Sequence, residues 1–331
     1  MLTRRRFLAG ASGGLVLVTL GRGRSAGVLG QSNAAARTEP EGLTESTEFP
    51  YTVMAPAVGK DGYYPGITVS QLTPYQGGAI LITAINALAG SVSVFGRTYT
   101  MAMGPEGLSG FVGFGVLDPP GSTTMSLELT DTQNQPLNYQ YEVRVRETQW
   151  TFDDIIIPPP PPPDPDAPPP PPPLPDEQPR LNELYAMVTP RRWERPFILP
   201  LTLGGDVFIS GYFGEERSFN GGPRGGHHGG TDIGAPMGTE IHATNRGMVV
   251  LAEETRNRGN LVVLDHGAGI FSCYGHQSAL RVLVGDVVER GDVLGLVGST
   301  GLSSGPHLHW EMSVGGVLVD GLRWLDGTQG F

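Results

Sequence analysis

A nearly unbroken run of prolines, Pro158–Pro175, divides this chain of 331 residues into two parts. Proline fixes φ and has no backbone N–H, so the run can form neither a helix interior nor a central strand. We expect a polyproline II segment, which extends about 3.1 Å per residue, and we interpret 158–180 as a semi-rigid linker. A ligand role toward a proline-binding domain is the alternative. The linker predicts separately folded regions on its two sides.

The region before the prolines, 50–157, has the pattern of an all-β domain. Met125, Leu127 and Leu129 alternate with polar neighbours, as do other short apolar runs that Gly, Pro and Asn separate. Alternation in short, regularly spaced segments predicts a β-sandwich. The region contains no histidine and no acidic pair with catalytic spacing. We therefore interpret it as an accessory domain that either recognises a partner or serves as a spacer.

The region after the linker is predicted to begin with a helix and to continue as strands. Apolar residues recur at helical spacing from Leu181 to Val188, so we expect a helical connector over 181–195. The segment 196–331 is rich in Gly and Val, and Gly315-Gly316 has the composition of a two-residue hairpin turn. Its predicted strands are Val207–Ser210, Gly247–Ala252, Leu261–Asp265, Ile270–Tyr274, Val293–Val297 and His307–Ser313. The predicted fold class is mainly β, with an N-terminal β-sandwich, a proline-rich linker and a C-terminal antiparallel-β domain.

Two residue pairs in the C-terminal region have the composition of a metal site. His228 and Asp232 stand four residues apart in HHGGTD, and His307 and His309 stand two apart in GPHLHWE. Side chains alternate faces in a strand, so these even spacings place both members of a pair on one face. Two antiparallel strands could then direct imidazoles and a carboxylate at one point. We predict that His228, Asp232 and His309 bind one Zn²⁺ ion per chain and leave a coordination position for water.

Two further histidines are candidates for proton transfer. His307 lies beside the predicted ligand His309, and His276 follows an apolar run at a polar turn, in FSCYGHQS. We predict that His276 and His307 flank the water as general base and general acid, in an order that the sequence leaves open. Glu311 falls on the same strand face as His309, so it either orients that imidazole or forms a surface salt bridge.

These motifs resemble those of the lysostaphin-type zinc endopeptidases of bacterial cell walls, some of which also carry an N-terminal β-domain. The resemblance covers Phe208 to Leu325 and includes RSFNGGP, HHGGTDIGAPMGTEIHA, NLVVLDHGAGIFSCYGHQS and VGDVVERGDVLGLVGSTGLSSGPHLHWEM in that order. It implies zinc ligands at His228, Asp232 and His309. It also implies that His276 and His307 assist catalysis.

The resemblance further implies an activity and a partner. We expect a zinc metalloendopeptidase that hydrolyses peptide bonds in peptidoglycan, during either remodelling or lysis of the wall. Some members of the family have lost metal ligands and only activate other wall hydrolases, whereas this chain keeps all five site positions. A non-catalytic wall-binding protein, or a regulator of another wall hydrolase, is therefore the alternative. A peptidase that acts on proteins is a second alternative.

Charge and cysteine content argue against other classes of function. The net charge of −11 argues against nucleic acid as a partner, because nucleic-acid binding needs basic patches. Cys273 is the only cysteine of the sequence, so a disulfide framework and a cysteine-rich metal site are both excluded. No cysteine near the N-terminus is available for a lipid anchor. We expect Cys273, in the apolar run IFSCY, to be buried.

The N-terminus has the features of an export signal. The basic residues of TRRRFLAG precede an apolar stretch that is too short and too rich in glycine for a good membrane span. The paired arginines resemble a twin-arginine signal, and a general secretory signal is the alternative. We expect a signal over 1–36, a disordered segment over 37–49, and a mature chain without a stable membrane span. The expected location is the periplasm or cell envelope.

Changing Arg4 and Arg5 to lysine tests which signal this is. Lysine keeps the positive charge but lacks the planar guanidinium fork, so a twin-arginine receptor should reject the variant. We expect its precursor to accumulate in the cytoplasm, as measured by cell fractionation and immunoblotting. A control variant with Arg22 and Arg24 changed to lysine should be exported normally. Normal export of the Arg4/Arg5 variant would assign the chain to the general secretory route.

Overall fold

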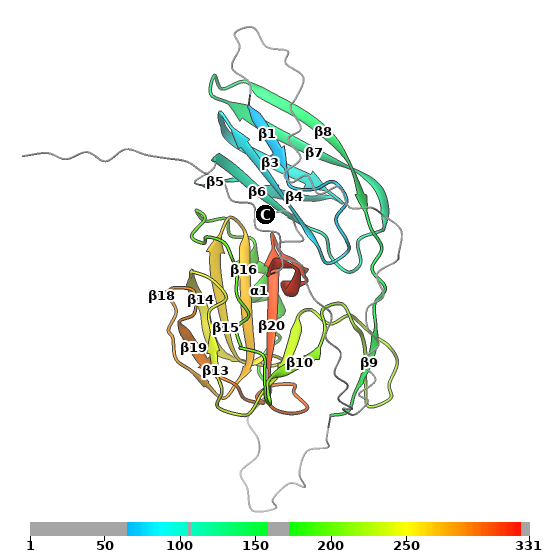
Figure 1. Ribbon diagram of the computed structural model, residues 1–331, viewed down its shortest axis with the longest axis vertical. Coiled ribbons are helices and arrows are strands. Elements are labelled where there is room, and N and C mark those ends of the chain that lie inside the picture. Colours follow the sequence, from blue (N-terminus) through cyan, green and yellow to red (C-terminus); the bar gives the residue numbers. More distant parts are fainter. Residues whose placement is uncertain (1–64, 105–106, 158–171, 326–331) are drawn as a thin grey trace, which may run out of the picture. The chain divides into compact units, whose positions relative to one another are not determined.

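The computed structural model describes residues 65–104, 107–157 and 172–325. These residues belong to one compact unit, Thr47–Phe331. They form mostly strands, which confirms the predicted mainly-β fold class (Figure 1). The predicted signal over 1–36, the segment 37–49 and the prolines of 158–171 lie outside the described residues. Within the described ranges, every helix is too short or too polar to cross a bilayer.

Two four-stranded sheets form the N-terminal part. One has the strand order β1-β2-β6-β5, and the other has the order β4-β3-β7-β8. Strand β7 follows the predicted alternation, since Met125, Leu127 and Leu129 are buried and the residues between them are more exposed. The bounds are β1 Gly66–Val69, β2 Ala79–Ile85, β3 Ala87–Val94, β4 Arg97–Thr100, β5 Ala102–Gly104, β6 Gly107–Gly113, β7 Gly121–Asp131 and β8 Pro136–Val145.

An eight-stranded antiparallel sheet forms the C-terminal part. Its order is β10-β12-β20-β16-β15-β14-β18, with β21 paired to β20, and a separate three-stranded sheet has the order β13-β19-β17. The bounds are β10 Phe208–Gly211, β12 Thr231–Gly234, β13 Glu240–His242, β14 Gly247–Thr255, β15 Gly259–Gly267, β16 Ile270–Gln277, β17 Ala279–Leu280, β18 Val287–Val288, β19 Val293–Leu296, β20 His307–Val314, β21 Val317–Val319 and the 3₁₀ turn η1 Gly321–Trp324. The six predicted strands correspond to β10, β14, β15, β16, β19 and β20. The remaining strands have two to four residues, too few for alternation to reveal them.

Strand β20 lies in the middle of the large sheet, between β12 and β16 (Figure 1). Residues from Leu308 to Val314 are buried on both faces, including the polar side chains of His309 and Glu311. The strand turns into β21 through Gly315 and Gly316, whose φ angles are 55° and 84°. Two consecutive positive φ angles are typical of a tight hairpin turn, which confirms the predicted turn.

The helix α1, Gln178–Tyr185, packs on the large sheet. It begins three residues before the start of the predicted connector because apolar spacing marks only its buried side. Leu181 and Tyr185 are buried against a cluster that includes Phe271 and Cys273. The Tyr185 hydroxyl lies 2.8 Å from the Cys273 sulfur, so the lone cysteine is buried, as expected.

Strand β9, Phe152–Ile155, pairs with a strand of the C-terminal region. It lies within the range that the sequence assigns to the sandwich, yet it runs parallel to β11, Glu216–Phe219. The pairing is reinforced by Asp154, whose Oδ1 accepts hydrogen bonds from the Ser218 hydroxyl at 2.5 Å and the Gly221 N–H at 3.1 Å. A strand that precedes the proline run in the sequence therefore pairs directly with a strand that follows it.

His266, in β15, is fully buried away from the candidate site. Its Nδ1–H donates to the Arg246 carbonyl at 2.7 Å, and its Nε2 accepts from the Ser272 hydroxyl at 2.7 Å. Protonation would remove that acceptor and place a charge in the interior. Burial accordingly lowers the pKa of His266 to about 4.

The metal-free protein should therefore lose stability in acid through His266. The unfolded chain binds a proton near pH 6.5, whereas the folded chain does so only near pH 4, so the stability contribution of neutral His266 is present above pH 6.5 and is lost as the pH falls toward 4. We expect this residue to account for a loss of about 2–3 kcal/mol between pH 7 and pH 4.5. Urea unfolding of wild type and His266→Gln at both pH values, with a chelator present, measures the contribution. An equal loss in both proteins would show that His266 is not responsible.

Candidate functional site

A single cleft of about 690 Å³ contains every side chain that the sequence predicts to bind metal or to transfer protons. His228, Asp232, His276, His307 and His309 all line it. The residues come from two separate segments of the C-terminal region and from the end of β16. The fold thus brings the predicted metal ligands and the predicted proton-transfer histidines together in one cleft.

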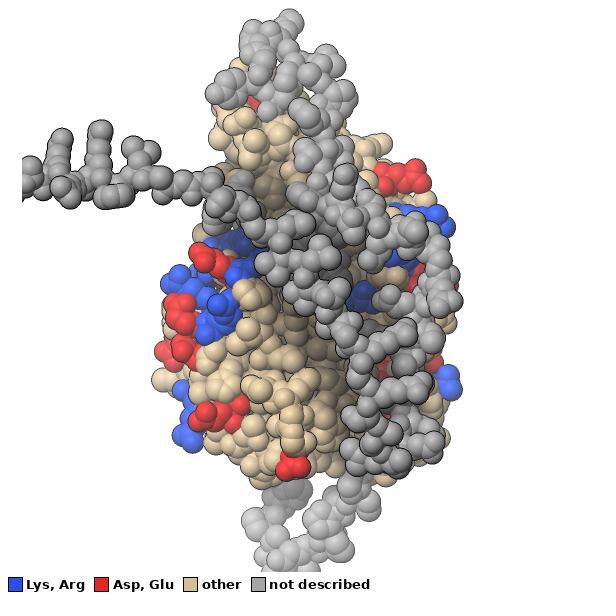
Figure 2. Space-filling model, in the orientation of Figure 1, with Lys and Arg blue, Asp and Glu red and all other residues tan. Residues whose placement is uncertain are grey.

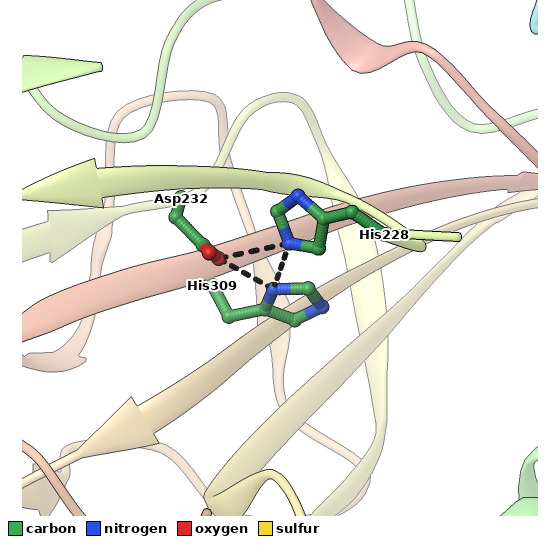
Figure 3. Close-up of side chains that lie close together, drawn as sticks. All are labelled: His228, Asp232 and His309. Carbon is green, nitrogen blue, oxygen red and sulfur yellow. Dashed lines mark hydrogen bonds and ion pairs between the residues drawn. The ribbon is translucent and has the colours of Figure 1, made fainter. Parts of the chain in front are cut away.

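The pairing of β12 with β20 sets a carboxylate opposite an imidazole. Asp232 and His309 are direct partners in the antiparallel register, and Asp232 Oδ1 lies 2.7 Å from His309 Nδ1. The Nε2 atom of His228 lies 3.1 Å from both of those atoms. Figure 3 shows the three side chains pointing toward one another.

His228 reaches this point by a route that differs from the predicted one. It precedes β12, which begins only at Thr231, so the expectation that His228 and Asp232 share a strand face is wrong. The chain arrives through Gly229 and Gly230, which have no side chain. A Cβ on Gly230 would lie 2.4 Å from the Trp310 carbonyl oxygen, so only glycine lets this segment approach β20 closely enough.

The cluster of His228, Asp232 and His309 fits a divalent cation. One potential ligand atom of each residue lies within 4.8 Å of the others, and all three side chains are buried. Two imidazole nitrogens and a carboxylate oxygen are donors that Zn²⁺ prefers. Burial alone would lower the pKa of His309, but hydrogen bonds to Asp232 and Glu311 outweigh it and raise the pKa to about 9. The metal-free cluster therefore holds a proton that a cation would replace.

Backbone carbonyls orient three of the imidazoles. The Nδ1–H of His228 donates to the Tyr212 carbonyl at 2.8 Å. His276 donates in the same way to Thr300 at 2.7 Å, and His307 donates to Gly305 at 2.8 Å. A ring nitrogen this close to a carbonyl oxygen must carry the proton, which leaves Nε2 unprotonated in a neutral ring. In each of the three rings it is therefore Nε2, and not Nδ1, that faces the cleft.

His276 and His307 lie beside the cluster and face each other. Their ring centroids are 4.6 Å apart, and His307 Nε2 lies 3.8 Å from Asp232 Oδ1. Burial, together with the neighbouring His309 and His307, lowers the pKa of His276 to about 3, so its ring is neutral at pH 7. His276 also has a φ of 60°, a strained conformation for a non-glycine residue that is more frequent at functional sites.

Arg217, on β11, contacts the second oxygen of the Asp232 carboxylate. Its Nη2 donates to Oδ2 at 2.6 Å, which leaves Oδ1 for the two histidines. Burial alone would raise the pKa of Asp232, but His228 and His309 hold it well below its usual range. Arg217 begins the RSFNGGP stretch of the family resemblance, but the sequence assigns it no role at the site, because a lone arginine in a short polar strand has no diagnostic spacing.

Glu311 anchors the other side of His309. Its Oε1 lies 2.9 Å from His309 Nε2, and it also accepts hydrogen bonds from Arg258 Nε at 2.9 Å and Nη2 at 2.7 Å. Glu311 is fully buried, so of the two alternatives left open by the sequence, orientation of the imidazole holds and a surface salt bridge does not. Burial would raise the pKa of Glu311, but Arg258 and His309 outweigh it and lower the pKa to about 2.

Strands β9 and β11 supply one wall of the cleft. Asp153 and Ile155 of β9, the following Ile157, and Arg217 and Phe219 of β11 line it. These residues alternate along each strand, as expected if one face of the two-stranded sheet is turned to the cleft. Another part of the lining comes from the loop 302–306. The cleft is therefore built partly from residues that precede the proline run.

The segment that contains His228, Asp232, His276, His307 and His309 is similar in sequence to known proteins. The family model described as Peptidase family M23 matches residues 226–321. A peptidoglycan DD-endopeptidase of Vibrio cholerae is 40% identical over 96 residues, which cover 29% of this chain and 22% of that protein. A murein hydrolase activator of Escherichia coli is 40% identical over 93 residues, which cover 28% of this chain and 22% of that protein. This chain therefore spans about a fifth of the length of these relatives.

A solved structure extends the comparison of fold beyond the matched residues. A peptidase M23 of Pseudomonas aeruginosa aligns with 76% of this chain and 94% of its own chain, with a TM-score of 0.53 and 22% identity. At this identity the likeness concerns the fold alone. The sequence match confirms the resemblance inferred from the motifs for this segment: residues 226–321 carry a peptidase M23 domain.

Proposed function

We propose that this protein is a zinc-dependent endopeptidase that hydrolyses peptide bonds in peptidoglycan. The observation that carries the proposal is the cleft in which His228, Asp232 and His309 converge while His276 and His307 direct their Nε2 atoms beside them. A cation site with adjacent proton acceptors is an arrangement suited to metal-assisted hydrolysis of an amide. The relative named a DD-endopeptidase supports peptidoglycan as the substrate class.

His228, Asp232 and His309 would hold the Zn²⁺ ion, and when bound the ion supplies Lewis acidity toward a carbonyl and a water molecule. The remaining chemistry belongs to His276 and His307. Each ring is fixed by its Nδ1–H bond to a carbonyl, so Nε2 is held in place to accept a proton from the attacking water. The same atom can then donate the proton to the leaving amine. Arg217 keeps the Asp232 carboxylate oriented throughout.

The second candidate is a non-catalytic regulator of another wall hydrolase. The similarity to a murein hydrolase activator favours it, because that relative is as similar in sequence as the endopeptidase. The complete set of donors and proton acceptors in this chain favours the enzyme instead.

On the face drawn in Figure 2, Lys and Arg side chains lie interspersed with Asp and Glu, and the net charge is −11. Both features argue against a nucleic-acid partner. We further propose that the chain acts in the periplasm or cell envelope.

Mass spectrometry of muropeptides released from purified sacculi tests the function. The enzyme should release peptides from the wall, and a chelator should abolish the release while added zinc restores it. The new peptide termini also identify the bond that is cut. Zinc-loaded, folded protein that releases nothing but stimulates another purified wall hydrolase would establish the regulator and overturn the proposal.

Alanine substitution of the two histidines of β20 should separate metal binding from proton transfer. We expect His309→Ala to lose the metal, because His309 supplies a ligand nitrogen, whereas His307→Ala should keep about one zinc per chain. The turnover of His307→Ala should fall about 10²–10⁴-fold, the usual contribution of a positioned acid or base. Metal analysis and muropeptide release measure the two properties. His242→Ala, outside the cleft, is the matched control and should change neither; loss of zinc from His307→Ala alone would exchange the assigned roles.

A further inference from the structure

Glu177 lies at the point where the proline-rich segment meets α1, outside the residues that match the M23 family. It occupies the N-cap position of α1, yet its carboxylate makes no cap hydrogen bond to the helix. Side chains at this position usually satisfy the free N–H groups of the first helical turn. The carboxylate of Glu177 is instead buried and directed at a different part of the chain.

The Glu177 carboxylate holds the turn between β14 and β15. Its Oε2 accepts from the Asn257 N–H at 3.2 Å and lies 3.4 Å from the Asn257 side-chain amide. Its Oε1 accepts from the Arg258 N–H at 3.2 Å and from Arg258 Nη1 at 3.1 Å. One carboxylate thus fixes both the backbone and the guanidinium of Arg258.

Arg258 in turn connects this turn to the candidate metal centre. Its guanidinium lies between two buried carboxylates, Glu177 and Glu311, and it donates to Glu311 from two nitrogens. Burial alone would lower the pKa of Arg258, but Glu311 and the other acidic neighbours outweigh it and raise the pKa, so the group is charged. The Arg258 carbonyl also accepts the N–H of His276 at 2.7 Å.

Glu311 connects Arg258 to the predicted metal ligand His309. Glu311 Oε1 lies 2.9 Å from His309 Nε2, which fixes the ring with Nδ1 toward Asp232 and His228. The other oxygen of Glu311 is buried without a hydrogen-bond partner among the described residues, so the carboxylate depends on the contacts that its Oε1 makes with Arg258 and His309. If Arg258 moved, Glu311 would be left as a poorly compensated buried charge next to His309.

We propose that Glu177 is a positioning residue for the metal centre, acting on His309 through Arg258 and Glu311. This inference rests on the proposed function, because it assumes that His309 binds the metal. Partners beyond the direct ligands fix the orientation of a ligating imidazole, and their loss typically costs 10–100-fold in metal affinity. The segment that follows the prolines would therefore support the metal centre as well as connect the two parts of the chain.

The affinity for zinc of Glu177→Gln, measured by competition with a chromogenic chelator, tests the proposal. Glutamine has nearly the same shape but lacks the charge and one of the two acceptors that Arg258 and Asn257 share. We expect the affinity to fall about 10–100-fold. The matched control is Glu253→Gln. It removes the exposed ion pair between Glu253 of β14 and Arg180 of α1, and it should leave the affinity for zinc unchanged.

A second measurement reports on the imidazole itself. Nitrogen-detected NMR of the metal-free protein should show the His309 proton shared with Glu311 at Nε2 in wild type and in Glu253→Gln, and a changed pattern in Glu177→Gln. If Glu177→Gln does not fold, Arg258→Lys replaces it, because lysine keeps the charge but cannot bridge two carboxylates with a planar fork. The expected loss of zinc affinity is the same.

The outcomes separate this inference from the proposed function. Variants that lose thermal stability but bind zinc within twofold of wild type, with an unchanged His309 spectrum, would show that Glu177 only anchors α1 and would overturn the proposal. Wild-type protein that binds no zinc would overturn the proposed function itself.

Discussion

The antiparallel pairing of β12 with β20 is the constraint on which the rest of the site depends. It sets Asp232 directly opposite His309, with 2.7 Å between the carboxylate oxygen and the ring nitrogen. Because β20 is buried on both faces and alternates polar side chains such as His309 and Glu311 with apolar ones, a slip of one residue would move the polar side chains into the apolar face. The same burial makes the polar atoms of Asp232 and His309 costly to leave unpaired, and Arg217, His228 and Glu311 supply partners for them.

In each of these side chains, one polar atom makes a structural hydrogen bond and another faces the cleft. One nitrogen of His228, His276 and His307 is committed to a backbone carbonyl, and one oxygen of Asp232 is committed to Arg217. The opposite atom of each is left for the cleft. His309 differs because its second nitrogen faces a carboxylate, Glu311, which in turn depends on Arg258. A carboxylate partner raises the pKa of this imidazole, whereas the pKa values of His228 and His276 are lowered, and it connects His309 to the segment around Glu177.

Local sequence patterns predicted those parts of the site whose geometry is local. The spacing of His307 and His309 placed them correctly on one face of a strand, and the even spacing of the β7 residues predicted the sandwich. The same rule failed for His228, because the Gly229–Gly230 segment and not a strand carries it to Asp232. Arg258 and Glu177 could not be predicted, since their contacts join residues far apart in the chain, 80 or more positions apart for Glu177. The parallel pairing of β9 with β11 escaped prediction for the same reason.

Anomalous diffraction at the zinc absorption edge, from crystals of the zinc-loaded protein, tests the central claim most directly. We expect one anomalous-difference peak per chain, at about 2.0–2.2 Å from a nitrogen of His228, a nitrogen of His309 and one oxygen of Asp232. His276 and His307 should lie near the peak without bonding to it. A peak located elsewhere, or one ligated by His276 or His307 in place of His309, would contradict the assignment of this cluster as the metal centre.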